Sequence, residues 1–95
     1  MSKTTQSLAT RTWSVDILIG EHDGQTNARA RLHTGDRTSL EATGTARLNP
    51  SDRDVPEIGD ELAASRALSA LAHLLLDTAA SDIEGVTHAR AVLSE

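Results

Sequence analysis

An Asp-Gly pair, Asp23-Gly24, lies between two stretches in which apolar and polar residues alternate. Alternation with a period of two is typical of a strand that buries one face. Asp-Gly favours the type I′ turn of a two-residue hairpin, because both central residues need positive φ. A slip of one residue would move every apolar side chain to the opposite face. The sequence therefore predicts a hairpin in which three apolar pairs face each other: Ile19 with Ala28, Ile17 with Ala30, and Val15 with Leu32.

A third stretch with the same alternation follows. A loop with an odd number of residues, most simply Gly35-Asp36-Arg37, keeps its apolar residues on the same face as those of the second strand. Leu32 then faces Leu40, Ala30 faces Ala42, and Ala28 faces Gly44. We therefore predict a three-stranded antiparallel meander with strands at about 12–20, 25–34 and 38–48.

The apolar face of this sheet is lined largely by alanine and glycine, so a helix can approach it closely. Asp60 and Glu61 supply the negative charge that favours a helix N-terminus, and the pattern predicts a long helix at about 59–78. Ser81 and Glu84 have the spacing of a capping box, which predicts a short second helix at about 82–88. The expected fold is α+β with the order β-β-β-α-α, a disordered tail at 1–11 and one domain at 12–93.

The apolar arc of the long helix spans more than half of its circumference, and one sheet needs a stripe of only about 100°. A second helix or a second copy of the chain must cover the remainder. Because the first and third strands are open edges that invite pairing, we predict a homodimer. Candidate partner contacts are Leu18, Arg53, Leu74 and Leu76, and Trp13 is expected to cap the core.

Composition excludes several classes of function. The chain has 95 residues and no cysteine, so disulfides and thiolate chemistry are excluded. Trp13 is its one aromatic residue, which argues against base stacking on the sheet. No apolar run reaches the roughly 18 residues of a membrane helix, and the N-terminus lacks a signal-peptide pattern, so we expect a cytoplasmic protein.

Chemistry-bearing motifs are sparse. The four histidines show no metal-ligand spacing. His73 and Asp77 have a spacing that suits an ordinary pair on a helix surface better than a catalytic dyad. We expect no catalytic residue, metal, cofactor or small-molecule substrate.

The polar face of the predicted sheet carries a cluster of basic residues. The register places Arg31 between Asp16 and Glu41, which predicts a charge network across the strands. Net charge is −5, and the acidic excess lies in residues 51–95, so a nucleic-acid surface must be a local patch in the first half. The candidate phosphate contacts are Arg31 and four basic residues expected to lack an acidic partner: Arg29, His33, Arg47 and, in the loop, Arg37.

One long segment resembles a known family. The segment at 46–62, ARLNPSDRDVPEIGDEL, with SRALS at 65–69, is similar to a family of small actinobacterial proteins that includes dormancy-associated members of mycobacteria. WSVDI at 13–17, ARARL at 28–32 and SDIE at 81–84 fit the same resemblance, which covers about 12–88. The resemblance implies a fold like that of double-stranded-RNA-binding domains. It also implies a likeness to the hibernation factors that bind the small ribosomal subunit.

Two functions remain open at this point. The first is a non-enzymatic stress or dormancy protein that binds the ribosome or structured RNA through the basic side of the sheet. The alternative is a dimeric protein-interaction module or structural regulator without RNA contact.

Overall fold

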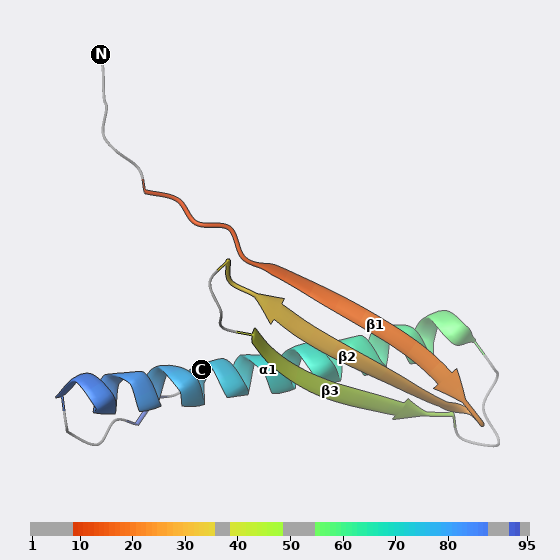
Figure 1. Cartoon of the computed structure of the whole chain (residues 1–95). Helices are drawn as coiled ribbons and strands as arrows, with labels where there is room; N and C mark the ends of the chain where they lie inside the picture. Colours follow the sequence, from red (N-terminus) through yellow and green to blue (C-terminus); the bar gives the residue numbers. More distant parts are fainter. Residues whose placement is uncertain (1–8, 36–38, 49–54, 88–91, 94–95) are drawn as a thin grey trace, which may run out of the picture.

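A computed structural model describes residues 9–35, 39–48, 55–87 and 92–93 of the chain. Three antiparallel strands, β1 (Ser14–His22), β2 (Gln25–His33) and β3 (Ser39–Arg47), form a sheet in the order β1-β2-β3. One long helix, α1 (Pro56–Thr87), crosses one face of this sheet diagonally and continues beyond its end (Figure 1). Residues 9–13, which include 9–11 of the predicted tail, have no regular secondary structure, and residues 1–8 lie outside the described part of the chain.

The predicted hairpin and its register are confirmed. Val15 pairs with Leu32, Ile17 with Ala30, and Ile19 with Ala28. Asp23 and Gly24 have φ values of 51° and 73°, as a type I′ turn requires. Leu48, just after β3, donates its amide N–H to the Gly24 carbonyl at 2.7 Å, which ties the end of β3 to this turn.

The predicted register of the third strand is confirmed as well. Leu32 pairs with Leu40, Ala30 with Ala42, and Ala28 with Gly44. The last pair is His33 with Ser39, so the connection has the expected odd number of residues. The predicted three-residue loop includes residues 36 and 37, which lie outside the described residues.

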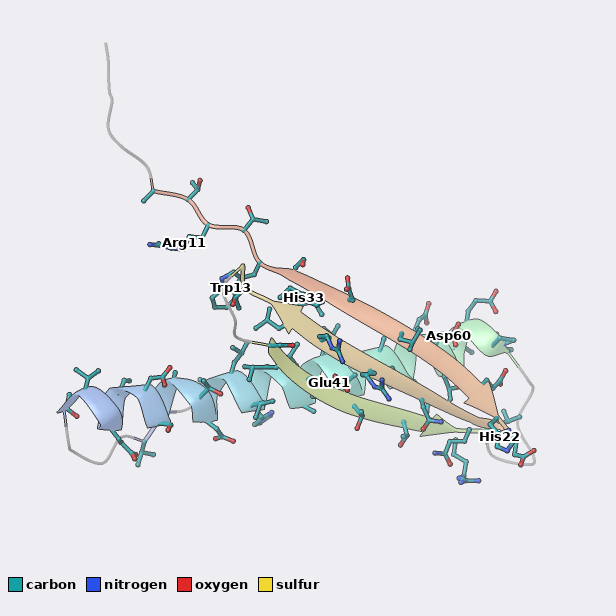
Figure 2. The ribbon with its side chains drawn as sticks, in the orientation of Figure 1. Arg11, Trp13, His22, His33, Glu41 and Asp60 are labelled. Carbon is teal, nitrogen blue, oxygen red and sulfur yellow. The ribbon has the colours of Figure 1, made fainter. Side chains whose placement is uncertain are left out.

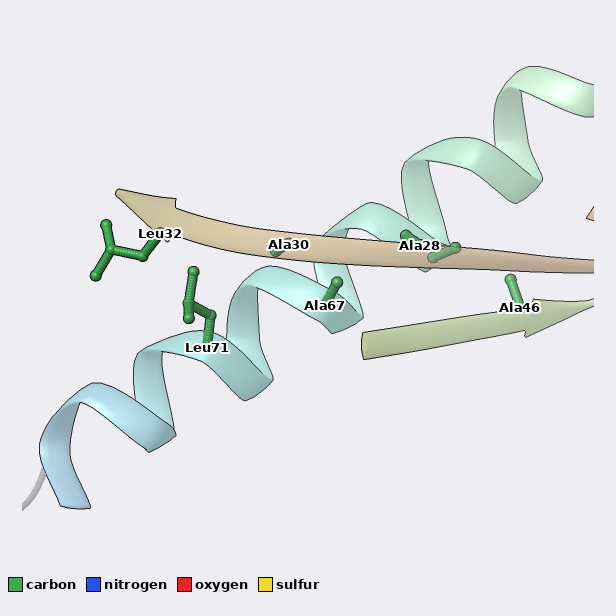
Figure 3. Close-up of a cluster of buried hydrophobic side chains, with 7 residues drawn as sticks. Ala28, Ala30, Leu32, Ala46, Ala67 and Leu71 are labelled. Atoms are coloured by element: carbon green, nitrogen blue, oxygen red, sulfur yellow. The ribbon is translucent and has the colours of Figure 1, made fainter. Parts of the chain in front are cut away.

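The core lies between α1 and the strands β2 and β3 (Figure 3). Its members are mostly alanines, which lets two backbones come close together. A Cβ atom added at Gly44 would lie 2.3 Å from the Ala67 amide nitrogen and 2.5 Å from the Ala63 carbonyl oxygen. Glycine at position 44 is therefore a condition for this packing. The buried apolar residues are Ala28, Ala30, Leu32, Ala46, Ala63, Ala67 and Leu71.

The prediction of two helices is wrong, because α1 is continuous over 32 residues, about 48 Å at the rise of an α-helix. Ser81 and Glu84, the expected capping box, lie inside it. A capping box can begin a new helix only where the helix before it has ended. Ala79 and Ala80, directly before Ser81, are strong helix formers, so the first helix continues through them. The start at Pro56, three residues earlier than predicted, suits the first helical position, where a proline loses no hydrogen bond.

Candidate functional site

The open face of the sheet carries the basic residues that the sequence singled out, and Glu41 lies among them (Figure 2). Arg29 contacts one carboxylate oxygen of Glu41 at 3.0 Å between Nε and Oε2. Arg31 binds the other oxygen, Oε1, at 2.7 Å from Nη2 and 3.1 Å from Nε. The hydrogen bonds from Arg31 are the main cause of a lowered pKa at Glu41, and the positive charges of Arg31 and Arg29 lower it further. The two arginines thus share one acid, which offsets one of their two positive charges.

The remaining basic residues of this face also have partners. His33 Nε2 lies 3.0 Å from Asp16 Oδ2 on the neighbouring strand. Arg47 donates a hydrogen bond to the Gln25 side-chain oxygen. The predicted placement of Arg31 between Asp16 and Glu41 is confirmed by the register, and Arg31 binds Glu41. The expectation that Arg29 and His33 lack an acidic partner is wrong. Both reach acids that lie diagonally across the strands, whereas the register names only directly opposed residues.

The candidate partner contacts have different environments. Leu18 is 69% exposed on the same open face. Leu74 and Leu76 on α1 are half-buried, and Leu74 lines a shallow groove with Ala42. Arg37, the fifth candidate phosphate contact, and Arg53, the fourth candidate partner contact, lie outside the described residues.

A second surface, on the helix-covered side of the sheet, was not singled out from the sequence. Val15, Ile17 and Ile19 of β1 project to the same face as the buried Ala28, Ala30 and Leu32, yet they are 40%, 38% and 40% exposed. The cause is the position of α1, which packs mostly on β3 and β2 and barely reaches β1. We call Val15, Ile17 and Ile19, with the outer backbone edge of β1, the uncovered β1 face.

Trp13 extends this surface at one end of β1, while His22 marks the other end (Figure 2). The indole is half exposed and lines a hollow with Leu32, Leu40 and Leu75. Trp13 therefore lies beside residues at the edge of the core, with about half of it exposed. On α1, Leu68 is seven residues from Leu75, a spacing that places both on one side of a helix, and it is 42% exposed.

The two edge strands, β1 and β3, differ in the hydrogen bonds that their backbones receive from outside the sheet. At the β3 edge, Arg66 of α1 donates a hydrogen bond from Nη1 to the Thr45 carbonyl oxygen at 2.8 Å. Over the described residues, no hydrogen bond from outside the sheet reaches the backbone of β1. Because an unprotected edge strand is a template for pairing, β1 is the open side of the molecule.

The histidines lie far apart. His22 contacts Asp23 at the hairpin turn, His33 contacts Asp16, and a ring nitrogen of His73 lies 2.9 Å from the Ser69 carbonyl oxygen within α1. His88 lies outside the described residues. Among the described residues, no three metal-ligating side chains gather in one place. In the same part of the chain, no helix combines the length and apolar character needed to cross a membrane.

These features define a small α+β protein: a three-stranded antiparallel sheet, one long helix on one face, and an open apolar edge strand. Residues 11–92 match the Rv2632c-like family, and the chain belongs to that family. Two relatives, the uncharacterised proteins Mb1767 of Mycobacterium bovis and MT1780 of Mycobacterium tuberculosis, are each 55% identical over 76 residues, 80% of this chain and 80% of the relative. The crystal structure of Rv2632c matches with a TM-score of 0.79 and 45% identity, covering 88% of this chain and 99% of that one.

Proposed function

We propose that this chain is a non-enzymatic protein-interaction module whose binding surface is the uncovered β1 face. The observation that carries the proposal is the exposure of three large branched apolar residues, Val15, Ile17 and Ile19, on a face that is otherwise core. Contiguous exposed apolar surface of this kind marks interaction sites in proteins.

The free energy available from covering the three side chains is small, which indicates that the backbone edge of β1 must also take part in binding. Full burial of a Val or Ile side chain contributes about 1.5–3 kcal/mol. Since about two fifths of each of the three remains exposed, covering them all contributes on the order of 2 kcal/mol. That is too little for a stable complex alone. A partner that also adds a strand to β1 gains main-chain hydrogen bonds, the usual mode of recognition at a sheet edge.

RNA or ribosome binding is the second candidate function. It is favoured by the position of Arg29, Arg31, His33 and Arg47 on one exposed face, and by the resemblance to hibernation factors. The proximity of Glu41 and Asp16 to three of these residues counts against it, as does the net charge of −5. Phosphate affinity depends on the number of cations presented. A fold relation to double-stranded-RNA-binding domains, a dormancy role and a cytoplasmic location stay predictions.

The test of the protein-interaction proposal uses two adjacent residues of one strand. Ile17→Lys places a charge on the uncovered β1 face, and Leu18→Lys places the same charge on the opposite face. Proximity labelling in the source cell, followed by reconstitution with each purified partner found, compares both variants with the wild type. We expect a partner that binds the wild type and Leu18→Lys but is lost with Ile17→Lys. Equal partner binding by all three proteins would overturn the proposal.

The RNA candidate is tested by co-sedimentation with 30S and 70S ribosomes across a salt series. Binding that falls steeply with salt and is lost in the Arg29→Gln/Arg47→Gln double variant would support it, because counterion release sets that slope. No sedimentation at low salt would exclude it.

A further inference from the structure

We infer that the cavity between the start of α1 and the hairpin end of the sheet binds a small primary amine. The ligand is an alkylammonium ion whose apolar chain fills the cavity and whose charged end lies at Glu21 and Thr26. The site is separate from the uncovered β1 face, so the inference goes beyond the proposed function. The cavity opens where the β1–β2 turn meets the first turns of α1 (Figure 1). Its volume is about 380 Å³, at the lower end of the range of ligand pockets in proteins.

Residues that are distant in sequence form the walls of this cavity. Glu21, Thr26 and Ala46 lie side by side across the three strands, on the face that α1 covers. Most of the remaining lining is apolar and comes from the residues on either side of the β3–α1 connection and from the first two turns of α1: Leu48, Val55, Pro56, Ile58 and Leu62. A ligand body made of methylene groups suits these walls, because the burial of apolar surface drives its transfer from water.

Thr26 supplies a hydrogen-bonding group inside the cavity. This residue is 5% exposed, and among the described residues its hydroxyl forms no hydrogen bond. In the same part of the chain no fully enclosed polar side-chain atom lacks a partner, so the hydroxyl oxygen must reach the cavity that Thr26 lines. Gly59 faces it from α1, where an added Cβ would lie 2.8 Å from Oγ1. A nearly buried hydroxyl without a protein partner can accept a hydrogen bond from a ligand.

The carboxylate at the cavity selects a cation. Glu21 lies directly opposite Thr26 and lines the same cavity. Over the described residues it forms no ion pair, so its charge is open to a ligand. Arg47 also lines the cavity, but its guanidinium group donates a hydrogen bond to the Gln25 side chain on the open face of the sheet. An ammonium group has three N–H donors and can contact Glu21 and Thr26 together.

The start of α1 does not reverse this preference, although a helix N-terminus generally attracts anions. Pro56 has no amide N–H, and the Ile58 N–H donates to the Val55 carbonyl oxygen at 3.0 Å. The first two turns of α1 also carry three carboxylates, which compensate the positive end of the helix dipole: Glu57, Asp60 and Glu61. An anionic ligand would meet these charges as well as Glu21, so the cavity favours an ammonium group over a carboxylate.

The test is an NMR titration of the full chain with three compounds that share one alkyl chain and differ in head group: hexylammonium, hexanol and hexanoate. We expect hexylammonium to shift the amide resonances of Thr26, Leu48 and Gly59, hexanol to bind more weakly, and hexanoate not to bind. Butylammonium should bind about fifteenfold more weakly than hexylammonium, because each buried methylene group changes the affinity about fourfold. Hexanol or hexanoate that binds as tightly as hexylammonium would overturn the inference. Shifts confined to Trp13 and Gly35 would also overturn it, because they place the compound in the hollow beside the indole.

Two substitutions test the polar contacts. Thr26→Val keeps the branched shape and removes the hydroxyl, and it should weaken hexylammonium binding about fivefold, the value of one hydrogen bond. Glu21→Gln should weaken it about threefold, because the carboxylate is exposed to solvent. Glu41→Gln removes an acid from the opposite face of the sheet and is the matched control, with unchanged affinity.

Thermal unfolding separates a binding role of Thr26 from a structural one. Since its hydroxyl has no protein partner to lose, Thr26→Val should melt no lower than the wild type while it binds hexylammonium more weakly. Unchanged affinity in Thr26→Val overturns the inference. Glu21→Gln, at an exposed position, keeps the test valid if Thr26→Val fails to fold, and its unchanged affinity would then be decisive against the amine site. Ile17→Lys should bind hexylammonium as the wild type does, so this inference and the proposed function fail separately.

Discussion

β1 and β2 have the same length and a similar alternation of apolar and polar residues, yet the apolar side chains of β2 are buried and those of β1 are partly exposed. Ala30 of β2 is fully buried, whereas Ile17, its direct partner on β1, is 38% exposed. The difference lies in side-chain size. Alanine and glycine on β2 and β3 let α1 approach to backbone contact at Gly44, while the branched residues of β1 hold a helix further away. The comparison shows that the smaller side chains mark where the chain packs on itself, and the larger ones mark the surface left for another molecule.

The largest expected effect comes from Gly44→Ala, compared with Gly20→Ala on β1. A Cβ at Gly44 would overlap the backbone of α1, whereas a Cβ at Gly20 meets nothing within 4 Å. We expect Gly44→Ala to lower the free energy of unfolding by about 3 kcal/mol, at the upper end of overpacking costs. Gly20→Ala should raise it by about 0.5 kcal/mol, because alanine loses less conformational freedom on folding than glycine. Urea denaturation checks both, and equal effects would refute the contrast between the strands.

Leu32→Ala and Ile17→Ala, two substitutions in the same hairpin, form the second comparison. Leu32 is 2% exposed, so its truncation leaves a cavity and should cost about 2–5 kcal/mol. Ile17 is open to solvent on one side, and its truncation should cost about 1 kcal/mol in the monomer. Thermal unfolding at low protein concentration measures this difference.

Ser81→Ala extends the contrast to α1, whose first half packs on the sheet while its last turns are largely exposed. In a continuous helix the substitution should raise the free energy of unfolding by about 0.5 kcal/mol, because alanine is the better helix former. As the cap of a separate helix, Ser81 would instead be worth about 1 kcal/mol, and its loss would be destabilising. The sign of the change in urea denaturation therefore distinguishes the two arrangements.

The smallest expected effect is at Glu41, on the exposed face of the sheet. Its pKa is lowered from an ordinary value of 4.5, so the folded state favours the ionised form. The resulting stabilisation is complete above the ordinary pKa and is lost as the pH falls through the lowered one. Thermal unfolding of Glu41→Gln should therefore approach that of the wild type as the pH falls below 4.5. Arg31→Gln should weaken the same pH dependence, and a pH-independent difference would contradict the assignment.

What the sequence by itself determined is the local pairing. The Asp23-Gly24 turn and the parity of the apolar residues specify the register of all three strands, because a slip by one residue exposes a whole face. The small residues of β2 and β3 also identified the surface on which a helix packs closely. The candidate site was less predictable. The basic residues and the pairing of Arg31 with Glu41 were located, but the acidic partners of Arg29 and His33 were not, because side-chain reach across a face depends on rotamers that no spacing encodes.

Only the tertiary structure decided which strands α1 covers and which edge stays open. Val15, Ile17 and Ile19 show the same alternation as a buried strand, and periodicity reports one apolar face without telling what lies on it. The path of α1 depends on how near two backbones come at Gly44, a distance between residues remote in sequence. The continuity of α1 through Ser81 was likewise undecided by the motif, since the same residues suit a helix start and a helix interior.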